Sequence, residues 1–339
     1  MQYRTLGRTG IKVSPYALGT LMFATRMGNE PEESARIIHR ALAAGINFLD
    51  TADAYADSEE VVGKALEGRR DNVVLATKFG RPVGEDPNQR GTSRRWIVKA
   101  VENSLRRLRT DYIDVYQIHR LDPSTDFEET LSALTDLVRS GKVRAVGSSN
   151  TPASEMVEAQ WVAERRNLER FRTEQPPYSL LNRGIEREVL PVAQRHGMGV
   201  LVWGPLAQGM LTGRVRRNQE NPLLRAGLAR HLTDVRRIDV VERLIPLAEE
   251  AGLPLTHLAL AFTIAHPGVT SALVGARTAA HLDDLVAAFD VRLDDDLLER
   301  IDEIVPPGTD VTALDQDYRP PVLLDPHLRR RPATERAAA

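Results

Sequence analysis

The chain has 339 residues, of which 42% are hydrophobic and 27% charged, and its formal net charge is -2. This ordinary globular balance argues against a surface that binds nucleic acid or anionic membranes. There is no cysteine, which excludes disulfides, thiolate metal sites and a cysteine nucleophile, and fits a reducing compartment.

The chain shows no targeting pattern. Its first residues lack a basic stretch followed by an apolar core, and no apolar run approaches the roughly 18 residues of a membrane span. We therefore expect a cytoplasmic protein without a nucleic-acid or membrane partner. Nothing in the sequence decides the oligomeric state, and a homo-oligomer is left open.

In chain order, residues 3–13 alternate loosely around a glycine-containing turn and predict a small hairpin. Short apolar segments then alternate with segments of helical periodicity. The expected strands are 16–20, 46–50, 72–78, 112–119, 143–150, 171–175, 199–204 and 271–276. The expected helices are 31–45, 58–68, 93–108 (with Ser93 as its N-cap), 126–141, 153–166, 187–197 and 278–289.

Eight strands alternating with helices predict an α/β fold with a parallel sheet. Eight repeats favour a closed (β/α)8 TIM barrel over an open doubly wound sheet, so we expect one domain over 1–305. Residues 306–339 are rich in proline and aperiodic, which predicts a partly disordered C-terminal extension. The alternative is that this segment folds over the mouth of the barrel.

Polar side chains or tryptophan stand at or just beyond the ends of most predicted strands. They are Asp50, Lys78, His119, Ser149, Asn150, Gln175, Trp203 and Arg277. The C-terminal ends of barrel strands meet on one face, where catalytic residues lie, so these side chains should be neighbours. Each has a structural interpretation when taken singly, but their joint occurrence at successive strands favours an active site.

Four of these positions suit the reduction of a carbonyl group: Asp50, Tyr55, Lys78 and His119. A tyrosine hydroxyl with a pKa of about 10 is a poor acid at neutral pH. A nearby lysine lowers that pKa, a carboxylate keeps the lysine charged, and a histidine can donate a hydrogen bond to a carbonyl oxygen. Side chains supply no hydride, so such a site needs a redox cofactor.

At these residues the sequence resembles the aldo-keto reductase family. The matching segments run from Tyr3 to Ile304 and include FLDTADAYADSEEVVGKAL, VLATKFG, DYIDVYQIHRLDP, GKVRAVGSSN, EQPPYSLLNR, WGPLAQGMLTG and LVGAR. The resemblance implies a (β/α)8 barrel with an N-terminal hairpin closing its base. It also implies an NADPH-dependent reductase of aldehydes or ketones, with Tyr55 as general acid, Lys78 and Asp50 tuning it, and His119 orienting the carbonyl.

The resemblance further implies that NADPH lies extended across the barrel mouth, without a Rossmann domain or a metal. Ser149, Asn150 and Gln175 would hold the carboxamide, and Trp203 would stack on the nicotinamide. The GPLAQG stretch and Arg214 would meet the phosphates, and Arg277 the 2′-phosphate. The implied cofactor positions are Gly19, Thr20, Asp50, Ser149, Asn150, Gln175, Trp203, Gly204, Pro205, Leu206, Gln208, Gly209, Arg214, Gly275, Arg277, His281 and Asp284.

The sequence departs from the family pattern at three places. Ala56 and Asp57 follow the tyrosine where glycine is frequent, His281 stands where glutamine is usual, and Leu285 where asparagine is usual. The four predicted catalytic residues are unaffected, whereas the contacts to the adenine end of the cofactor are altered.

Two other functions are compatible with parts of this pattern. A non-catalytic cofactor sensor, like the channel-associated β-subunits of the family, commonly replaces the histidine, and His119 therefore favours an enzyme. A barrel lyase would use Lys78 as a Schiff base, but would leave the segments around Trp203 and Arg277 without a role. The carbonyl substrate is not fixed by the sequence, since by the resemblance it depends on the loops 22–30 and 80–91 and on the tail.

Overall fold

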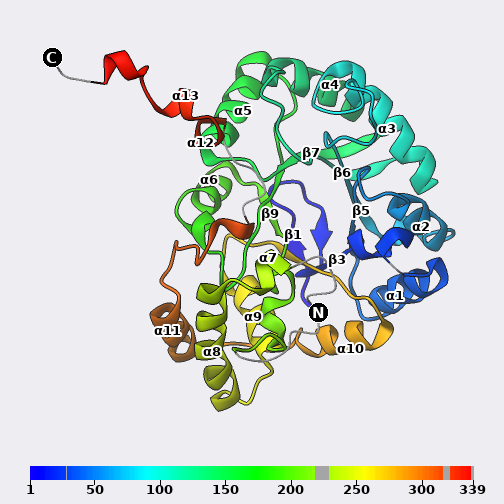
Figure 1. Cartoon of the computed structure of the whole chain (residues 1–339). Helices are drawn as coiled ribbons and strands as arrows, with labels where there is room; N and C mark the ends of the chain where they lie inside the picture. Colours follow the sequence, from blue (N-terminus) through cyan, green and yellow to red (C-terminus); the bar gives the residue numbers. More distant parts are fainter. Residues whose placement is uncertain (28, 218–228, 316–320, 337–339) are drawn as a thin grey trace.

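The computed structural model describes residues 1–27, 29–217, 229–315 and 321–336. Eight parallel strands close into a barrel in the order β10-β3-β4-β5-β6-β7-β8-β9, and helices surround it (Figure 1). The predicted (β/α)8 barrel is confirmed. The strands are β3 (Tyr16–Gly19), β4 (Phe48–Asp50), β5 (Val74–Phe79), β6 (Ile113–Ile118), β7 (Val143–Ser149), β8 (Thr173–Gln175), β9 (Gly199–Val202) and β10 (Ser271–Val274).

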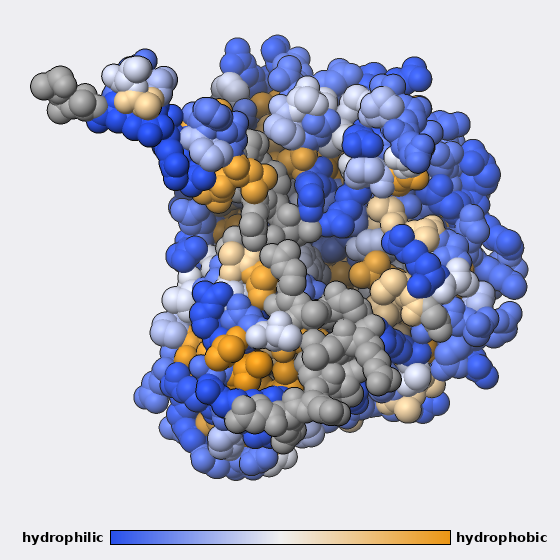
Figure 2. All heavy atoms as spheres, in the orientation of Figure 1, coloured by the Kyte–Doolittle hydropathy of each residue, from blue (hydrophilic) through white to orange (hydrophobic). Residues whose placement is uncertain are grey.

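The helices between the strands bury one face each against the barrel, and most of the outer ring is hydrophilic (Figure 2). Ser93 caps α3 as expected, since its hydroxyl accepts from the Trp96 amide at 3.3 Å. The long helices are α1 (Pro31–Ala43), α2 (Ser58–Ala65), α3 (Arg94–Leu108), α4 (Phe127–Arg139), α5 (Ala153–Arg166), α6 (Val189–His196), α8 (Val235–Glu250), α9 (Leu255–Ala265), α10 (Ala279–Ala287) and α11 (Asp295–Ile304). None of the described helices is long and apolar enough to cross a membrane.

The predicted N-terminal hairpin is also confirmed. Strands β1 (Arg4–Thr5) and β2 (Lys12–Val13) pair antiparallel. Leu6 and Val13 are fully buried against side chains of the barrel strands, which include Phe48. The hairpin therefore adds apolar side chains to the core inside the barrel.

Among the long helices of the described residues, α8, α9 and α11 are not predicted from the sequence. Helix α8 carries Pro246 within its length, and proline normally argues against a helix interior. Helix α9 is apolar on nearly all sides, with residues such as Leu258 and Phe262 buried, so it lacks the periodicity of an amphipathic helix. Neither segment can be recognised as a helix from its sequence unless its burial in the fold is known.

The first residues of the C-terminal extension bind to the loop before α6. The amide of Gly308 donates to Glu186 at 2.8 Å, and that of Val311 donates to the Leu181 carbonyl at 3.0 Å. Further on, α12 (Pro321–Leu324) and α13 (Pro326–Arg329) lie near the C-terminal end of the chain (Figure 1). Their leucines are exposed. Part of the expected disorder falls on 316–320 and 337–339, outside the described residues, and the proposed cover over the mouth stays a prediction.

The register of the strands decides which side chains lie level with one another at the C-terminal end of the barrel, called its upper end below. Asp50 lies beside Gly19 and Ala76, Lys78 lies beside Gln117, and Ser149 lies beside Gln175. Because the strands are parallel, a residue at the end of one strand is level with the residues that end its neighbours.

Gly63 allows α2 to pack directly on α3. A Cβ at this position would lie 2.5 Å from the carbonyl oxygen of Arg107, which is backbone and cannot rotate away. We predict that Gly63→Ala lowers the free energy of unfolding by about 1–3 kcal/mol through overpacking. Helix propensity alone would predict a gain of roughly 0.5–1 kcal/mol.

Urea unfolding checks this prediction. The neighbouring exposed Lys64→Ala is the control and should change the free energy of unfolding by less than about 0.5 kcal/mol. A stabilised Gly63→Ala protein would contradict the proposed close contact.

Candidate active site

A buried ion pair lies at the upper end of the barrel, between β4 and β5. Lys78 and Asp50 are each 1% exposed, and the Lys78 ammonium donates to the Asp50 carboxylate and, at 2.9 Å, to the Thr51 carbonyl. The second Asp50 oxygen accepts from Gln175 Nε2 at 2.8 Å. Burial disfavours the ammonium, but the charges and hydrogen bonds of Asp50 and Tyr55 outweigh this and raise the pKa of Lys78.

Tyr55 follows β4 on a short loop and packs between the ion pair and His119. The Lys78 Nζ atom lies 5.3 Å from its ring centroid, and the His119 ring meets it edge-on at 5.5 Å. Desolvation raises the pKa of the Tyr55 hydroxyl, the Lys78 charge opposes this, and the Asp50 charge adds to the rise. The net pKa is raised, so the lysine acts in the predicted direction but is outweighed by burial.

His119 directly follows β6 and is 5% exposed. Desolvation, together with the positive charges of Lys78, Arg81 and Arg120, holds its pKa well below the ordinary value. The imidazole is therefore neutral at neutral pH and carries a single N–H. A neutral imidazole can donate one hydrogen bond without adding a second charge beside the ion pair.

A second group of polar side chains adjoins the ion pair at the ends of β7, β8 and β9. Trp203 Nε1 donates to Asn150 Oδ1 at 3.1 Å, and the Asn150 amide donates to the Ser149 hydroxyl at 2.9 Å. Ser149 in turn donates to the backbone carbonyl of Gln175 at 2.8 Å. These four predicted cofactor residues form one network, and Gln175 joins it to Asp50.

Two predicted positions near β3 have different surroundings. Thr20 is fully buried, and its hydroxyl donates to the Asp50 carbonyl at 3.0 Å. It therefore supports the strand that carries Asp50. Gly19 pairs in register with Asp50 on the same edge.

The segment after β9 has an irregular backbone. Gly204, Gln208 and Gly209 all have positive φ, at 71°, 56° and 99°, and Ala207 does so at 49°. Successive left-handed and turn conformations point backbone amides in one direction and can form anion-binding concavities. Of the other predicted residues here, Pro205 is buried, Leu206 is half-buried and Arg214 is exposed.

The predicted adenine-end residues lie around the N-terminus of α10. Gly275, Arg277 and His281 are exposed, and Thr278 caps the helix by accepting from the His281 amide at 3.2 Å. Asp284 Oδ1 lies 3.2 Å from His257 Nε2, so the Asp284 carboxylate faces α9. These residues belong to the same end of the barrel, but the described contacts do not join them to the ion pair.

Ala56 adopts the left-handed conformation, with a φ of 50°. This position is one of those where the family pattern has glycine, which tolerates that conformation at lower cost. The next residue, Asp57, accepts hydrogen bonds from the amide and hydroxyl of Thr25. The loop of Tyr55 is thereby joined to the loop after β3.

Glu174, next to Gln175 on β8, supports the site and was not predicted from the sequence. It is fully buried next to Gln175, and it accepts from the Ser148 hydroxyl at 2.5 Å and the Thr151 amide at 2.9 Å. These contacts hold together the ends of β7 and β8, from which Ser149 and Gln175 project. Its position one residue before a predicted site residue was the available signal, but strand alternation alone does not show which face is buried.

Comparison with known proteins agrees with this architecture. The model of the aldo/keto reductase family matches residues 16–306, and the chain belongs to that family. The family is one of oxidoreductases that generally use NADH or NADPH, acting on small molecules.

Relatives cover nearly the whole chain. The present chain is 39% identical to an uncharacterized oxidoreductase, YrpG, of Bacillus subtilis, over 91% of this chain and 97% of the relative. It is 36% identical to the aldo-keto reductase YhdN of the same organism, over 84% and 88%. It is also 34% identical to a probable voltage-gated potassium channel subunit beta of Arabidopsis thaliana, over 90% and 97%.

Glu174 should make stability depend on pH. Burial raises its pKa to about 7, against an unfolded value of about 4.3. The folded protein then binds the extra proton between these values, so this contribution is complete below about pH 4.3 and is lost as pH rises through 7. The loss amounts to roughly 3 kcal/mol.

We predict that wild type loses roughly 3 kcal/mol relative to Glu174→Gln between pH 4.5 and 8, measured by urea unfolding. The exposed Glu299→Gln is the control and should track wild type. A pH-independent difference between wild type and Glu174→Gln would show that the carboxyl group does not titrate in this range.

Proposed function

We propose that this protein is an NADPH-dependent oxidoreductase that reduces an aldehyde or ketone to an alcohol, with Tyr55 as the general acid. The observation that supports this most is the contact of Tyr55 with both the buried Lys78–Asp50 pair and the neutral His119. An acid, a cation that stabilises its conjugate base and a neutral hydrogen-bond donor together suit protonation of a carbonyl oxygen.

The residues at the ends of β7 to β9 fit a nicotinamide. A carboxamide needs both donors and acceptors, and Ser149, Asn150 and Gln175 offer both kinds within one network. Trp203 is half-buried beside them, which leaves ring surface for stacking. When bound, the reduced nicotinamide would supply the hydride.

Each of the four proposed catalytic side chains has a separate role in the reduction of the substrate. His119 donates a hydrogen bond to the carbonyl oxygen and orients it towards Tyr55. Tyr55 transfers its hydroxyl proton to that oxygen as the carbonyl carbon is reduced. Lys78 stabilises the resulting phenolate, and Asp50 keeps Lys78 charged and in position.

The similarity to a probable potassium channel subunit beta supports a second candidate, a cofactor-binding regulatory subunit without turnover. The two candidates differ in whether His119 and Tyr55 act on a substrate. NADPH oxidation across a panel of aldehydes and ketones distinguishes them. Cofactor binding without oxidation of any substrate would favour the regulatory subunit.

We predict that Tyr55→Phe binds NADPH as wild type does but loses turnover by roughly 10²–10⁴-fold, since a positioned general acid contributes about that factor. Single-turnover kinetics with a reactive aldehyde measure the loss, and fluorescence titration of NADPH is the matched binding control. Near-normal kcat in Tyr55→Phe would overturn the assignment of the acid.

We further predict that NADPH binds about ten- to a hundredfold more tightly than NADH. Arg277 and the N-terminus of α10 both favour an anion where the 2′-phosphate would lie. A charge-assisted hydrogen bond is worth about 1.5–3 kcal/mol.

Dissociation constants of both cofactors for wild type and Arg277→Ala test this preference. The substitution should weaken NADPH alone and leave NADH unchanged. Equal affinities of wild type for the two cofactors would show that Arg277 does not bind the phosphate.

A further inference from the structure

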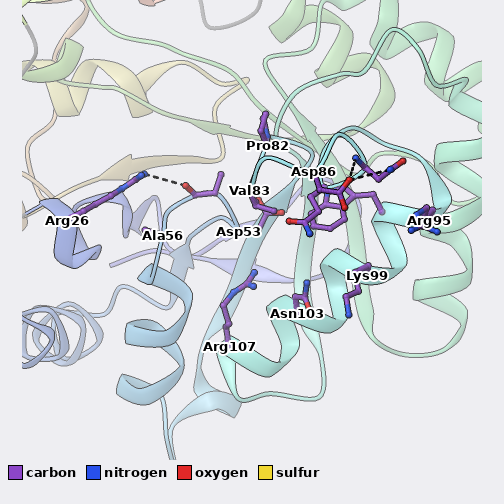
Figure 3. A pocket seen from close by; sticks show the side chains of 14 residues that line it. Arg26, Asp53, Ala56, Pro82, Val83, Asp86, Arg95, Lys99, Asn103 and Arg107 are labelled. Atoms are coloured by element: carbon purple, nitrogen blue, oxygen red, sulfur yellow. Dashed lines mark hydrogen bonds between the residues drawn. The ribbon is translucent and has the colours of Figure 1, made fainter.

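A cavity of about 850 Å³ lies between the loop of Tyr55, the 82–89 loop and α3 (Figure 3). It is lined by Asp53, Ala54 and Ala56, the neighbours of Tyr55, but by none of the four proposed catalytic residues. Small-molecule sites typically measure about 300–1,000 Å³, so the cavity is large enough for a small molecule. Its walls are mostly polar, unlike those of a typical apolar pocket.

Two buried polar groups line this cavity with hydrogen-bonding capacity left unused in the described residues. Asp53 is 7% exposed, and the Ala54 amide is the one backbone group that interacts with its carboxyl oxygens, without ordinary hydrogen-bond geometry. Trp96 is 4% exposed, and its indole N–H has no partner among the described residues. An unpaired buried polar group costs about 1–3 kcal/mol, so each is a position where a bound partner would be favoured.

The carboxyl group of Asp53 can both donate and accept. Burial, followed by the charge of Glu59, raises its pKa well above the ordinary value, which favours the protonated form. A protonated carboxyl donates one O–H and accepts at its other oxygen, and the Trp96 indole donates only. This combination matches hydroxyl groups, which also donate and accept.

Helix α3 contributes cationic side chains to the wall of the cavity. Arg95, Lys99, Asn103 and Arg107 follow one another along α3 and all line the cavity (Figure 3). Arg107 already pairs with the buried Glu59. Arg95 and Lys99 are exposed, make no ion pair with another described residue, and lie four residues apart on one helix face.

We propose that this cavity binds a small phosphorylated sugar or polyol beside the carbonyl-reducing site, at a place that none of the four proposed catalytic residues lines. The hydroxyl groups would satisfy Asp53 and Trp96, and the phosphate would meet Arg95 and Lys99. Bound there, the ligand would contact both neighbours of Tyr55 in sequence, Ala54 and Ala56. The site does not depend on the proposed reduction, because its ligand needs no free carbonyl.

Calorimetric titration of the full chain with methyl glucoside 6-phosphate tests the proposal. This probe carries hydroxyls and a phosphate, and its anomeric carbon is locked as an acetal, so it cannot be reduced. Methyl glucoside and inorganic phosphate represent its two halves. We expect both halves to bind at least about tenfold more weakly than the whole probe.

Variants locate the site. Arg95→Ala and Lys99→Ala should each weaken the sugar phosphate by about tenfold or more, and Trp96→Phe should weaken the two glucosides without affecting inorganic phosphate. Lys64→Ala, an exposed cation on α2 outside the cavity, should bind as wild type does. Tyr55→Phe should also bind as wild type does, which separates this site from the reductase assignment.

Three results would overturn the proposal. The first is no binding of methyl glucoside 6-phosphate to wild type. The second is binding of inorganic phosphate as tight as that of the whole probe, which would make the cavity an anion site only. The third is equal loss of affinity in Lys64→Ala and Lys99→Ala, which would indicate a general charge effect.

Discussion

The arrangement at the barrel mouth depends on one buried ion pair, Lys78 with Asp50. Two charges removed from water are tolerated only when they pair closely and their remaining hydrogen-bonding capacity is used. Asp50 provides this through Lys78 and Gln175, and Lys78 through Asp50 and the Thr51 carbonyl. Breaking such a pair by removing one partner typically costs about 3–5 kcal/mol, so the pair also holds β4, β5 and β8 in position.

The ion pair joins the neighbouring strands β4 and β5, but its contact with Gln175 on β8 requires the closed barrel. Gln175 is 125 residues away from Asp50 in the sequence, and it reaches the carboxylate across the barrel. The same closure brings His119 against Tyr55 and Trp203 against Asn150. A neutral imidazole and a high-pKa phenol therefore lie beside a single buried cation, which keeps the local charge low while providing a proton and a hydrogen bond.

Much of the fold follows from local patterns. Strands such as Val143–Ser149 and helices such as Arg94–Leu108 were predicted nearly to the residue, because apolar periodicity and caps are properties of short segments. Helices α8 and α9 were missed for the opposite reason. Proline inside the first and uniform apolarity in the second are compatible with a helix only when its packing partners are known.

Most of the predicted site residues stand at strand ends. Of these, Ser149, Asn150, Gln175 and Trp203 form the hydrogen-bond network that joins the ion pair through Gln175. Glu174 and Asp53 were not predicted, although both lie next to predicted residues. Their importance comes from burial, since a carboxyl group acquires a raised pKa only when it is removed from water. Strand alternation does not reveal that burial at a strand end or in a loop.

By itself, the sequence determined the alternation of eight strands with helices, the residues that end each strand and the membership of a family. These features depend on short segments or on the order of residues along the chain, so they can be read without the three-dimensional structure. Only the tertiary structure decided that Gln175 joins the Lys78–Asp50 pair, that desolvation outweighs the lysine at Tyr55, and that Asp53 and Trp96 line a cavity. Those outcomes depend on distance and burial, because electrostatic and hydrogen-bond energies are set by neighbours far apart in the chain.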